Sequence, residues 1–336
     1  MRHSFSYRES PRVCTERRSR DEVGENAQMS TAILPSGDQI ELTRGDHRAV
    51  IVEVGGGLRT YRVGDWDVLD GYGETDMCGG GRGQPLMPWP NRLRDGRYAY
   101  GGDSFQLGLS EPSTGTAIHG LVRWANWTVA TRSAAHVRME HVLHAQAGYP
   151  YILALAIEYT LDDRGLTVHT EATNRGARPC PFGAGAHPYL AAGTVTIDSC
   201  LLQVPAARRL TTDERSLPIG SDAVPGTDYD FRAARPIGST RLDTGYYELA
   251  RDGDGRARVT LSDPATSRTV TLWQDENYPY VMVFTGDALP EPGRRRQGLA
   301  VEPMTCAPDA FNSGDGLLTL APGETFSGQW GIEPAA

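Results

Sequence analysis

Short stretches in which apolar and polar residues alternate are the feature that most constrains the fold of this chain. In 165–174, Leu166 and Val168 fall on one face and polar residues fall on the other. The same period of two runs through 151–160 and 268–274. This period is typical of β-strands with one buried face, because successive side chains of a strand point to opposite sides.

Turn-forming residues separate these stretches. The chain has 39 glycines and 22 prolines, and no amphipathic pattern persists for more than three helical turns. These observations predict an all-β fold, a large antiparallel β-sandwich, in which residues 37–333 form a single domain. We interpret 205–245 as an elaborate connection within it. Residues 1–30 are expected to be a disordered tail, or upstream sequence read through to a true start near Met29.

Composition excludes several classes of function. A net charge of −9 disfavours nucleic acid and anionic membrane surfaces as partners. All 33 basic residues are arginine, which excludes Schiff-base chemistry, covalent pyridoxal phosphate and the P-loop lysine.

The cysteines predict neither disulfides nor a metal site. They are odd in number, scattered and without ligand-like spacing: Cys14, Cys78, Cys180, Cys200 and Cys306. Free thiols in a reducing cytoplasm are expected. No apolar run approaches the roughly 20 residues that span a bilayer.

Four segments break the rhythm of strands and turns. Each places ionisable or hydrogen-bonding groups beside rigid or aromatic residues, as a preorganised site on a β scaffold requires. They are Pro-Trp-Pro-Asn-Arg at 88–92, Ala-Ile-His-Gly at 117–120, Ala-His-Pro-Tyr-Leu at 186–190, and Val-Glu-Pro-Met-Thr-Cys-Ala-Pro-Asp-Ala-Phe-Asn at 301–312. His187 and Glu302, in the last two, suggest an acid–base pair.

Together these motifs resemble those of the aldose 1-epimerase (galactose mutarotase) family, in the same order and with similar spacing. The resemblance covers 37–333 and is closest to the bacterial branch. Single motifs are weak evidence, whereas four in register are strong.

The resemblance implies a β-supersandwich with an open sugar cleft, and interconversion of the α and β anomers of a free aldohexose. It implies that Glu302 is the general base on the anomeric hydroxyl and that His187 protonates the ring oxygen. By the same resemblance Arg92 and His119 bind and polarise the sugar, with Asn91 beside them.

Two further binding residues are less well defined. Asp243, in Arg-Leu-Asp-Thr-Gly-Tyr, is the expected aspartate for sugar hydroxyls, with Asp230 as the competitor. Trp273 either stacks on the sugar ring or is a core aromatic. Arg92 either offers its donors to vicinal hydroxyls or pairs with an aspartate such as Asp95.

The chemistry of anomerisation agrees with these assignments. One proton leaves the anomeric oxygen and one reaches the ring oxygen, so the reaction needs a base and an acid, which we expect on opposite sides of the ring. Histidine and glutamate can supply both near neutral pH. Neither a cofactor nor a metal is required.

Several alternatives stay open. The chain could be a non-catalytic carbohydrate-binding or sensing protein, a glycoside hydrolase or lyase, or a mutarotase specific for a 6-modified (sulfonated or phosphorylated) sugar. The run Arg294–Arg296 is either a solvated loop or a grip for such an anion. Relatives often carry asparagines where this chain has 109–111 and Thr116, which leaves the sugar open. The expected partner is a monosaccharide, and a homodimer is possible.

Overall fold

The computed structural model of the protein describes residues 33–336. The prediction for residues 1–30 lies outside the described part. The fold is all-β and its strands pair antiparallel, as the alternation predicted.

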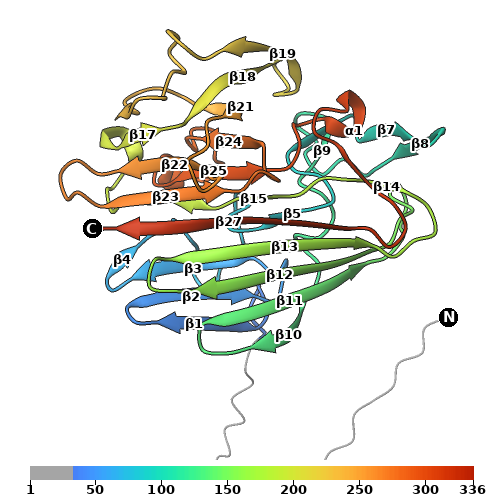
Figure 1. The fold of residues 1–336 in the computed structure, drawn as a ribbon, viewed down its shortest axis with the longest axis horizontal. Helices are drawn as coiled ribbons and strands as arrows, with labels where there is room; N and C mark the ends of the chain where they lie inside the picture. The colour runs from blue at the N-terminus through green and yellow to red at the C-terminus, as the bar shows by residue number, and fades with distance from the viewer. Residues whose placement is uncertain (1–32) are drawn as a thin grey trace, which may run out of the picture. The chain divides into compact units, whose positions relative to one another are not determined.

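The largest sheet has nine strands and carries the segments with the clearest alternation. In spatial order its strands are β10 (Thr128–Arg132), β11 (His136–Leu143), β12 (Leu153–Leu161), β13 (Leu166–Asn174), β27 (Thr325–Ala335), β23 (Thr269–Gln274), β22 (Ala257–Ser262), β17 (Leu201–Gln203) and β20 (Arg235–Pro236). In β13 every second residue is buried, from Leu166 to Asn174. The C-terminal strand β27 lies in the middle, between β13 and β23, and joins the two halves of the sheet (Figure 1).

A second sheet has eight strands and carries most of the site. In order these are β19 (Pro218–Ala223), β18 (Ala206–Thr212), β21 (Asp243–Leu249), β24 (Tyr280–Phe284), β25 (Leu299–Met304), β15 (Gly185–Ala186) and β5 (Pro85–Leu86), with β16 (Tyr189–Leu190) also paired to β25. The stretch 205–245 is more regular than an elaborate connection, because β18 and β19 form a hairpin at the edge of this sheet.

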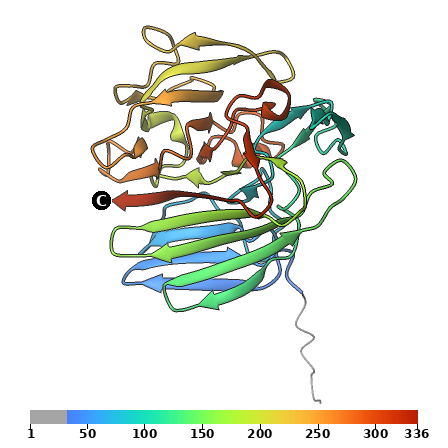
Figure 2. The same cartoon turned by 45° about the vertical axis from the view of Figure 1, so that its right-hand side comes forward.

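The smaller sheets complete the fold. A four-stranded sheet, which lies against β10–β13 in Figures 1 and 2, consists of β1 (Gln39–Arg44), β2 (His47–Val52), β3 (Leu58–Val63) and β4 (Trp66–Asp67). The two-stranded sheets are β14 (Cys180–Phe182) with β26 (Leu318–Leu320), β6 (Arg92–Arg94) with β9 (Thr116–Ile118), and β7 (Arg97–Tyr100) with β8 (Asp103–Gln106). Helical structure in 33–336 is limited to α1 (Ala310–Ser313) and the 3₁₀ turns η1 (Ile197–Ser199) and η2 (Pro292–Arg294).

None of the helices in residues 33–336 is both long enough and apolar enough to cross a membrane. The four cysteines in the same range are free and buried.

Two neighbouring residues of β23 test which face of the strand is buried, because their substitutions should change the free energy of unfolding by different amounts. Leu272 is fully buried in β23, whereas Thr271 beside it points to the other face. We expect Leu272→Ala to lower the free energy of unfolding in urea by about 2–5 kcal/mol, because it leaves a cavity. The control Thr271→Ala should cost about 1 kcal/mol or less. Equal losses from both variants would contradict the assignment of faces.

Candidate active site

The register of β25 brings His187 and Glu302 together. Gly185 pairs with Met304 and Tyr189 pairs with Ala300, so the antiparallel ladder puts His187 opposite Glu302. His187 Nε2 lies 3.3 Å from Glu302 Oε1. Both side chains are buried, with exposed fractions of 7% and 3%.

The ring of His187 is held on two sides. The Tyr189 ring stacks on it, with centroids 5.0 Å apart and planes 16° from parallel. Gly81, at φ +75°, approaches so closely that a Cβ there would lie 3.0 Å from His187 Cδ2. The Tyr189 hydroxyl donates to the carbonyl oxygen of Gly80, which fixes that loop against the stack.

His119 and Asn91 lock each other where β6 and β9 pair. Both have left-handed φ values, 63° and 55°. The backbone N–H of His119 donates to the backbone carbonyl of Asn91 at 2.9 Å. The backbone N–H of Asn91 donates in return to His119 Nδ1 at 3.2 Å. Because Nδ1 accepts, a neutral His119 carries its proton on Nε2, which makes Nε2 a hydrogen-bond donor.

His119, His187 and Glu302 offer the kinds of atoms that bind metal ions, but the tautomer of His119 disfavours a metal there. Ligand atoms of His119, His187 and Glu302 lie within 4.8 Å of one another. A metal needs an unprotonated nitrogen, and metal bound at His119 Nε2 would leave an Nδ1 proton facing the Asn91 amide. The arrangement therefore suits hydrogen bonding to oxygen better than coordination.

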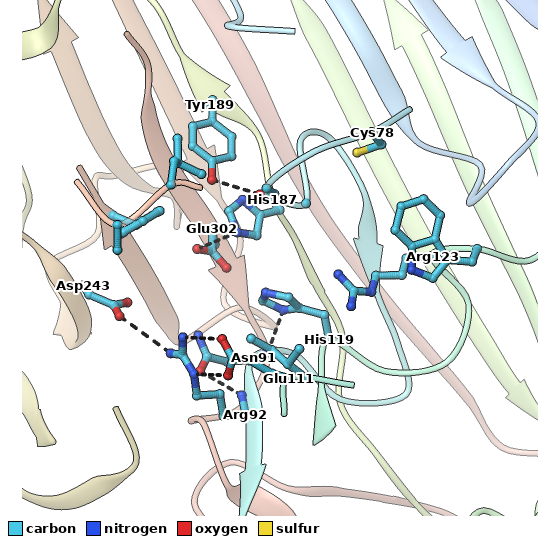
Figure 3. A pocket seen from close by; sticks show the side chains of 17 residues that line it. Cys78, Asn91, Arg92, Glu111, His119, Arg123, His187, Tyr189, Asp243 and Glu302 are labelled. Carbon is cyan, nitrogen blue, oxygen red and sulfur yellow. Dashed lines mark hydrogen bonds and ion pairs between the residues drawn. The ribbon is translucent and has the colours of Figure 1, made fainter. Parts of the chain in front are cut away.

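Arg92 lies beside this group between two carboxylates. Its Nε and Nη2 donate to Glu111 at 2.7 and 3.0 Å, and its Nη1 lies 3.7 Å from Asp243 (Figure 3). Of the two alternatives for Arg92, pairing with a carboxylate holds for one edge of its fork, which Glu111 occupies. Its partner is not Asp95, which pairs with Arg215.

All of these groups line one cavity of about 300 Å³. It contains six of the seven residues predicted from the sequence: Asn91, Arg92, His119, His187, Asp243 and Glu302. Asp230 does not line it and pairs with Arg232 in a turn. The structure thus favours Asp243 over its competitor.

Trp273 is the exception and requires a correction. It lies in β23, is 2% exposed, does not line the cavity, and is covered by the Arg256 guanidinium 3.6 Å from its ring centroid. It cannot stack on a sugar in this cavity, so the alternative of a core aromatic holds. Trp124, half exposed, lines the cavity instead.

Sequence reasoning also missed Arg123. It follows the Ala-Ile-His-Gly motif by three residues, and that proximity was the available signal. Its guanidinium points toward His119 in Figure 3. Within residues 33–336 no hydrogen bond or ion pair engages this guanidinium, whereas Arg82 pairs with Asp70 and Arg92 with Glu111.

The arginine run lies in a largely exposed loop, as one alternative expected, but its side chains interact within the protein and none of them lines the cavity. Arg294 pairs with Asp70, Arg295 donates to the Leu289 carbonyl, and Arg296 pairs with Asp198 and Asp287. The run fixes the segment that supplies Ala288 and Leu289 to the cavity wall.

Burial sets the protonation of the central pair. It lowers the pKa of His187, and the charges of Arg82, Arg123 and Arg92 lower it further. Burial also raises the pKa of Glu302 well above its usual value, with Asp243 adding to the rise and Arg92 opposing it. These directions place the proton of the pair on Glu302, and because the two groups lie 3.3 Å apart we expect them to titrate as a pair.

His187 and Glu302, the expected acid and base, lie next to each other, which corrects the expectation that they flank the ring from opposite sides. The anomeric hydroxyl and the ring oxygen are both bonded to the anomeric carbon. A base for one and an acid for the other must therefore converge on the same small region.

The chain is similar in sequence to proteins of one family. The family model described as aldose 1-epimerase matches residues 38–333. The Escherichia coli K12 protein YihR, described as uncharacterised, is 36% identical over 290 residues, 86% of this chain and 91% of YihR. The aldose 1-epimerase of the same organism is 26% identical over 281 residues, 73% of this chain and 77% of that protein.

Two solved structures have the same fold. A GalM/aldose epimerase homologue from C. elegans has a TM-score of 0.79 at 17% identity and covers 89% of this chain and 98% of its own. A galactose mutarotase-like protein from Clostridium acetobutylicum has a TM-score of 0.79 at 18% identity, with coverages of 88% and 95%.

The proton of the pair can be located by nitrogen NMR. We expect the His187 ring to be neutral in the sugar-free protein at about pH 6, where an unperturbed histidine is largely protonated. The measurement is the ¹⁵N chemical shifts of labelled histidines, with His187 assigned by their loss in His187→Gln. An imidazolium at that pH would place the proton on His187 and contradict the inferred state.

Proposed function

The chain belongs to the aldose 1-epimerase family, and we propose that it interconverts the α and β anomers of a free aldohexose by opening and closing the sugar ring. Membership of this isomerase family supports mutarotase activity in general. The observation that carries the finer proposal is the buried contact between His187 and Glu302 in a cavity lined by hydroxyl-binding groups.

The reaction begins from the pair with its one proton. The neutral pair and the form with a Glu302 carboxylate and a His187 imidazolium differ only by a proton moved across the 3.3 Å contact. In the second form Glu302 takes the proton of the anomeric hydroxyl while His187 gives its proton to the ring oxygen. The bond between the anomeric carbon and the ring oxygen breaks, and the anomeric carbon becomes a carbonyl.

Closure reverses the proton movements on the other face. After rotation about the bond between the first two carbons, His187 takes the proton back from the hydroxyl at the former ring-oxygen position. That oxygen attacks the opposite face of the carbonyl, and Glu302 returns its proton to the new anomeric oxygen. The pair ends as it began, so no net proton or electron is exchanged.

The neighbouring groups bind and orient the sugar. His119 Nε2 offers a proton toward sugar oxygens, because Nδ1 is committed to Asn91. Asp243 accepts from hydroxyls, and Nη1 of Arg92 donates beside it. The half-exposed Trp124 offers an apolar face for the C–H side of a sugar, the role expected of Trp273.

Removal of the base tests this function. We expect Glu302→Gln to lower kcat/KM for anomer exchange by about 10²–10⁴-fold, because a positioned general base is lost. Polarimetry or NMR exchange on a panel of aldohexoses measures it. Asp230→Asn, a carboxylate paired outside the cavity, is the control and should keep wild-type rates.

Two results would contradict the proposal. If no sugar on the panel equilibrates faster with the protein than without it, while calorimetry shows binding, the carbohydrate-binding alternative holds. If Glu302→Gln keeps the full rate, another group is the base.

Arg123 favours a second candidate, a sugar with an anionic substituent such as a 6-sulfonate or 6-phosphate. Within residues 33–336 no carboxylate pairs with the guanidinium of Arg123, and burial lowers its pKa. An arginine binds sulfonate or phosphate oxygens through parallel hydrogen bonds. A bound anion would give Arg123 a negatively charged partner, as Asp70 does for Arg82 and Glu111 does for Arg92.

Sugar selectivity separates the two candidates. If the substrate is anionic, we expect Arg123→Met to raise KM for the 6-sulfonated or 6-phosphorylated sugar by at least about tenfold, since a charged hydrogen bond contributes roughly 1.5–3 kcal/mol. KM for the unmodified aldohexose should change little. Wild-type protein that prefers the unmodified sugar would reject the anionic candidate.

A further inference from the structure

Glu111 holds Arg92 more completely than any other residue does. Besides the two guanidinium bonds, its Oε2 accepts from the Thr114 and Thr116 hydroxyls at 2.5 and 2.9 Å. A bidentate pair between arginine and carboxylate fixes the plane of the guanidinium. The two threonine hydroxyls hold the carboxylate in turn. Nη1 is then the guanidinium nitrogen of Arg92 that does not bind Glu111.

The pair also offsets the positive charge of Arg92 with the negative charge of Glu111. Arg92 is largely buried, and burial of a guanidinium without a partner is costly. Burial alone would raise the pKa of Glu111, but bonds from Arg92 and the two threonines outweigh it and lower the pKa. Glu111 is therefore a carboxylate that offsets the charge of Arg92 at neutral pH.

That offset matters because Arg92 acts on Glu302. The other charged and titratable groups that line the cavity with Glu302 are His187 and Tyr189 beside β25, His119 and Arg123 after β9, Arg92 on β6, Asp243 on β21, Glu111 before β9, and Cys78. Among them Arg92 lowers the proton affinity of Glu302 and Asp243 raises it. An Arg92 without Glu111 would act with its full charge and would be free to turn toward Glu302 or Asp243.

We propose that Glu111 is a positioning residue for the anomer exchange proposed above: it orients Arg92 so that Nη1 faces the sugar, and it balances the Arg92 charge so that Glu302 stays an effective base. The first part concerns sugar binding and the second concerns proton transfer. Each part has its own readout, and the second can be measured without turnover.

Glu111→Gln tests both parts. It removes the charge and turns an amide NH₂ toward Arg92, so we expect kcat/KM to fall by roughly 10²-fold, with an increase in KM, as Arg92 loses its position. The uncompensated Arg92 should stabilise the Glu302 carboxylate. The titration of Glu302, followed by ¹³C NMR and assigned by its loss in Glu302→Gln, should therefore move to lower pH.

Two variants separate charge from position. Glu111→Asp keeps the charge but is too short for the bidentate pair, so Glu302 should titrate as in wild type while kcat/KM falls. Glu140→Gln removes a similar partner, since Arg138 Nε donates to Glu140 at 2.7 Å outside the cavity, and should change neither readout. Thermal unfolding checks that each variant folds.

The outcomes distinguish this inference from the function on which it rests. Wild-type kcat/KM and wild-type Glu302 titration in Glu111→Gln would overturn the inference and leave the function intact. If the wild-type protein exchanges no anomers, the function fails, and the Glu302 titration still decides the electrostatic part. If Glu111→Gln does not fold, an unchanged kcat/KM in Glu111→Asp would overturn the positioning role.

Discussion

The antiparallel pairing of β25 with β15 and β16 is the constraint on which the rest of the site depends. It sets His187 opposite Glu302, although 114 residues separate them in the chain. Pro188 and Pro303 have no amide hydrogen to donate, so the ladder is interrupted where the two side chains meet. The sheet can therefore hold the buried side chains of His187 and Glu302 at a fixed distance while it leaves open the cavity that they face.

The sequence predicted the parts of the fold that local patterns encode. Alternation identified the buried faces of β12, β13 and β23, because a strand shows its burial at every second residue. It could not show that β27 is inserted between β13 and β23, because pairing between distant strands leaves no local signal. The hairpin β18–β19 escaped for a related reason: most of its residues are exposed or half-buried, so no apolar face stands out.

The residues that line the cavity could be predicted where a sequence motif marked them. The prediction failed where a neighbour in space, distant in sequence, determines the surroundings of a side chain. Trp273 follows Thr269 and Thr271 on the outward face of β23, and it is buried there because Arg256 covers its ring and Gly331 of β27 lies against it. The partner of Arg92 was equally hidden. Glu111 lies near it because β6 pairs with β9, whereas Asp95 is closer in sequence and pairs with Arg215 instead.

The distribution of charge around the cavity explains how so many ionisable groups can serve one proton exchange. Arg82 pairs with Asp70 at 3.1 Å and Arg92 pairs with Glu111 at 2.7 Å. These charges are therefore fixed and cannot compete for the proton of the substrate. The His187–Glu302 pair differs because burial works against both of its charged forms and so favours the neutral pair. Surrounded by fixed ion pairs, His187 and Glu302 are left as the groups that exchange protons with the two sugar oxygens in the reaction proposed above.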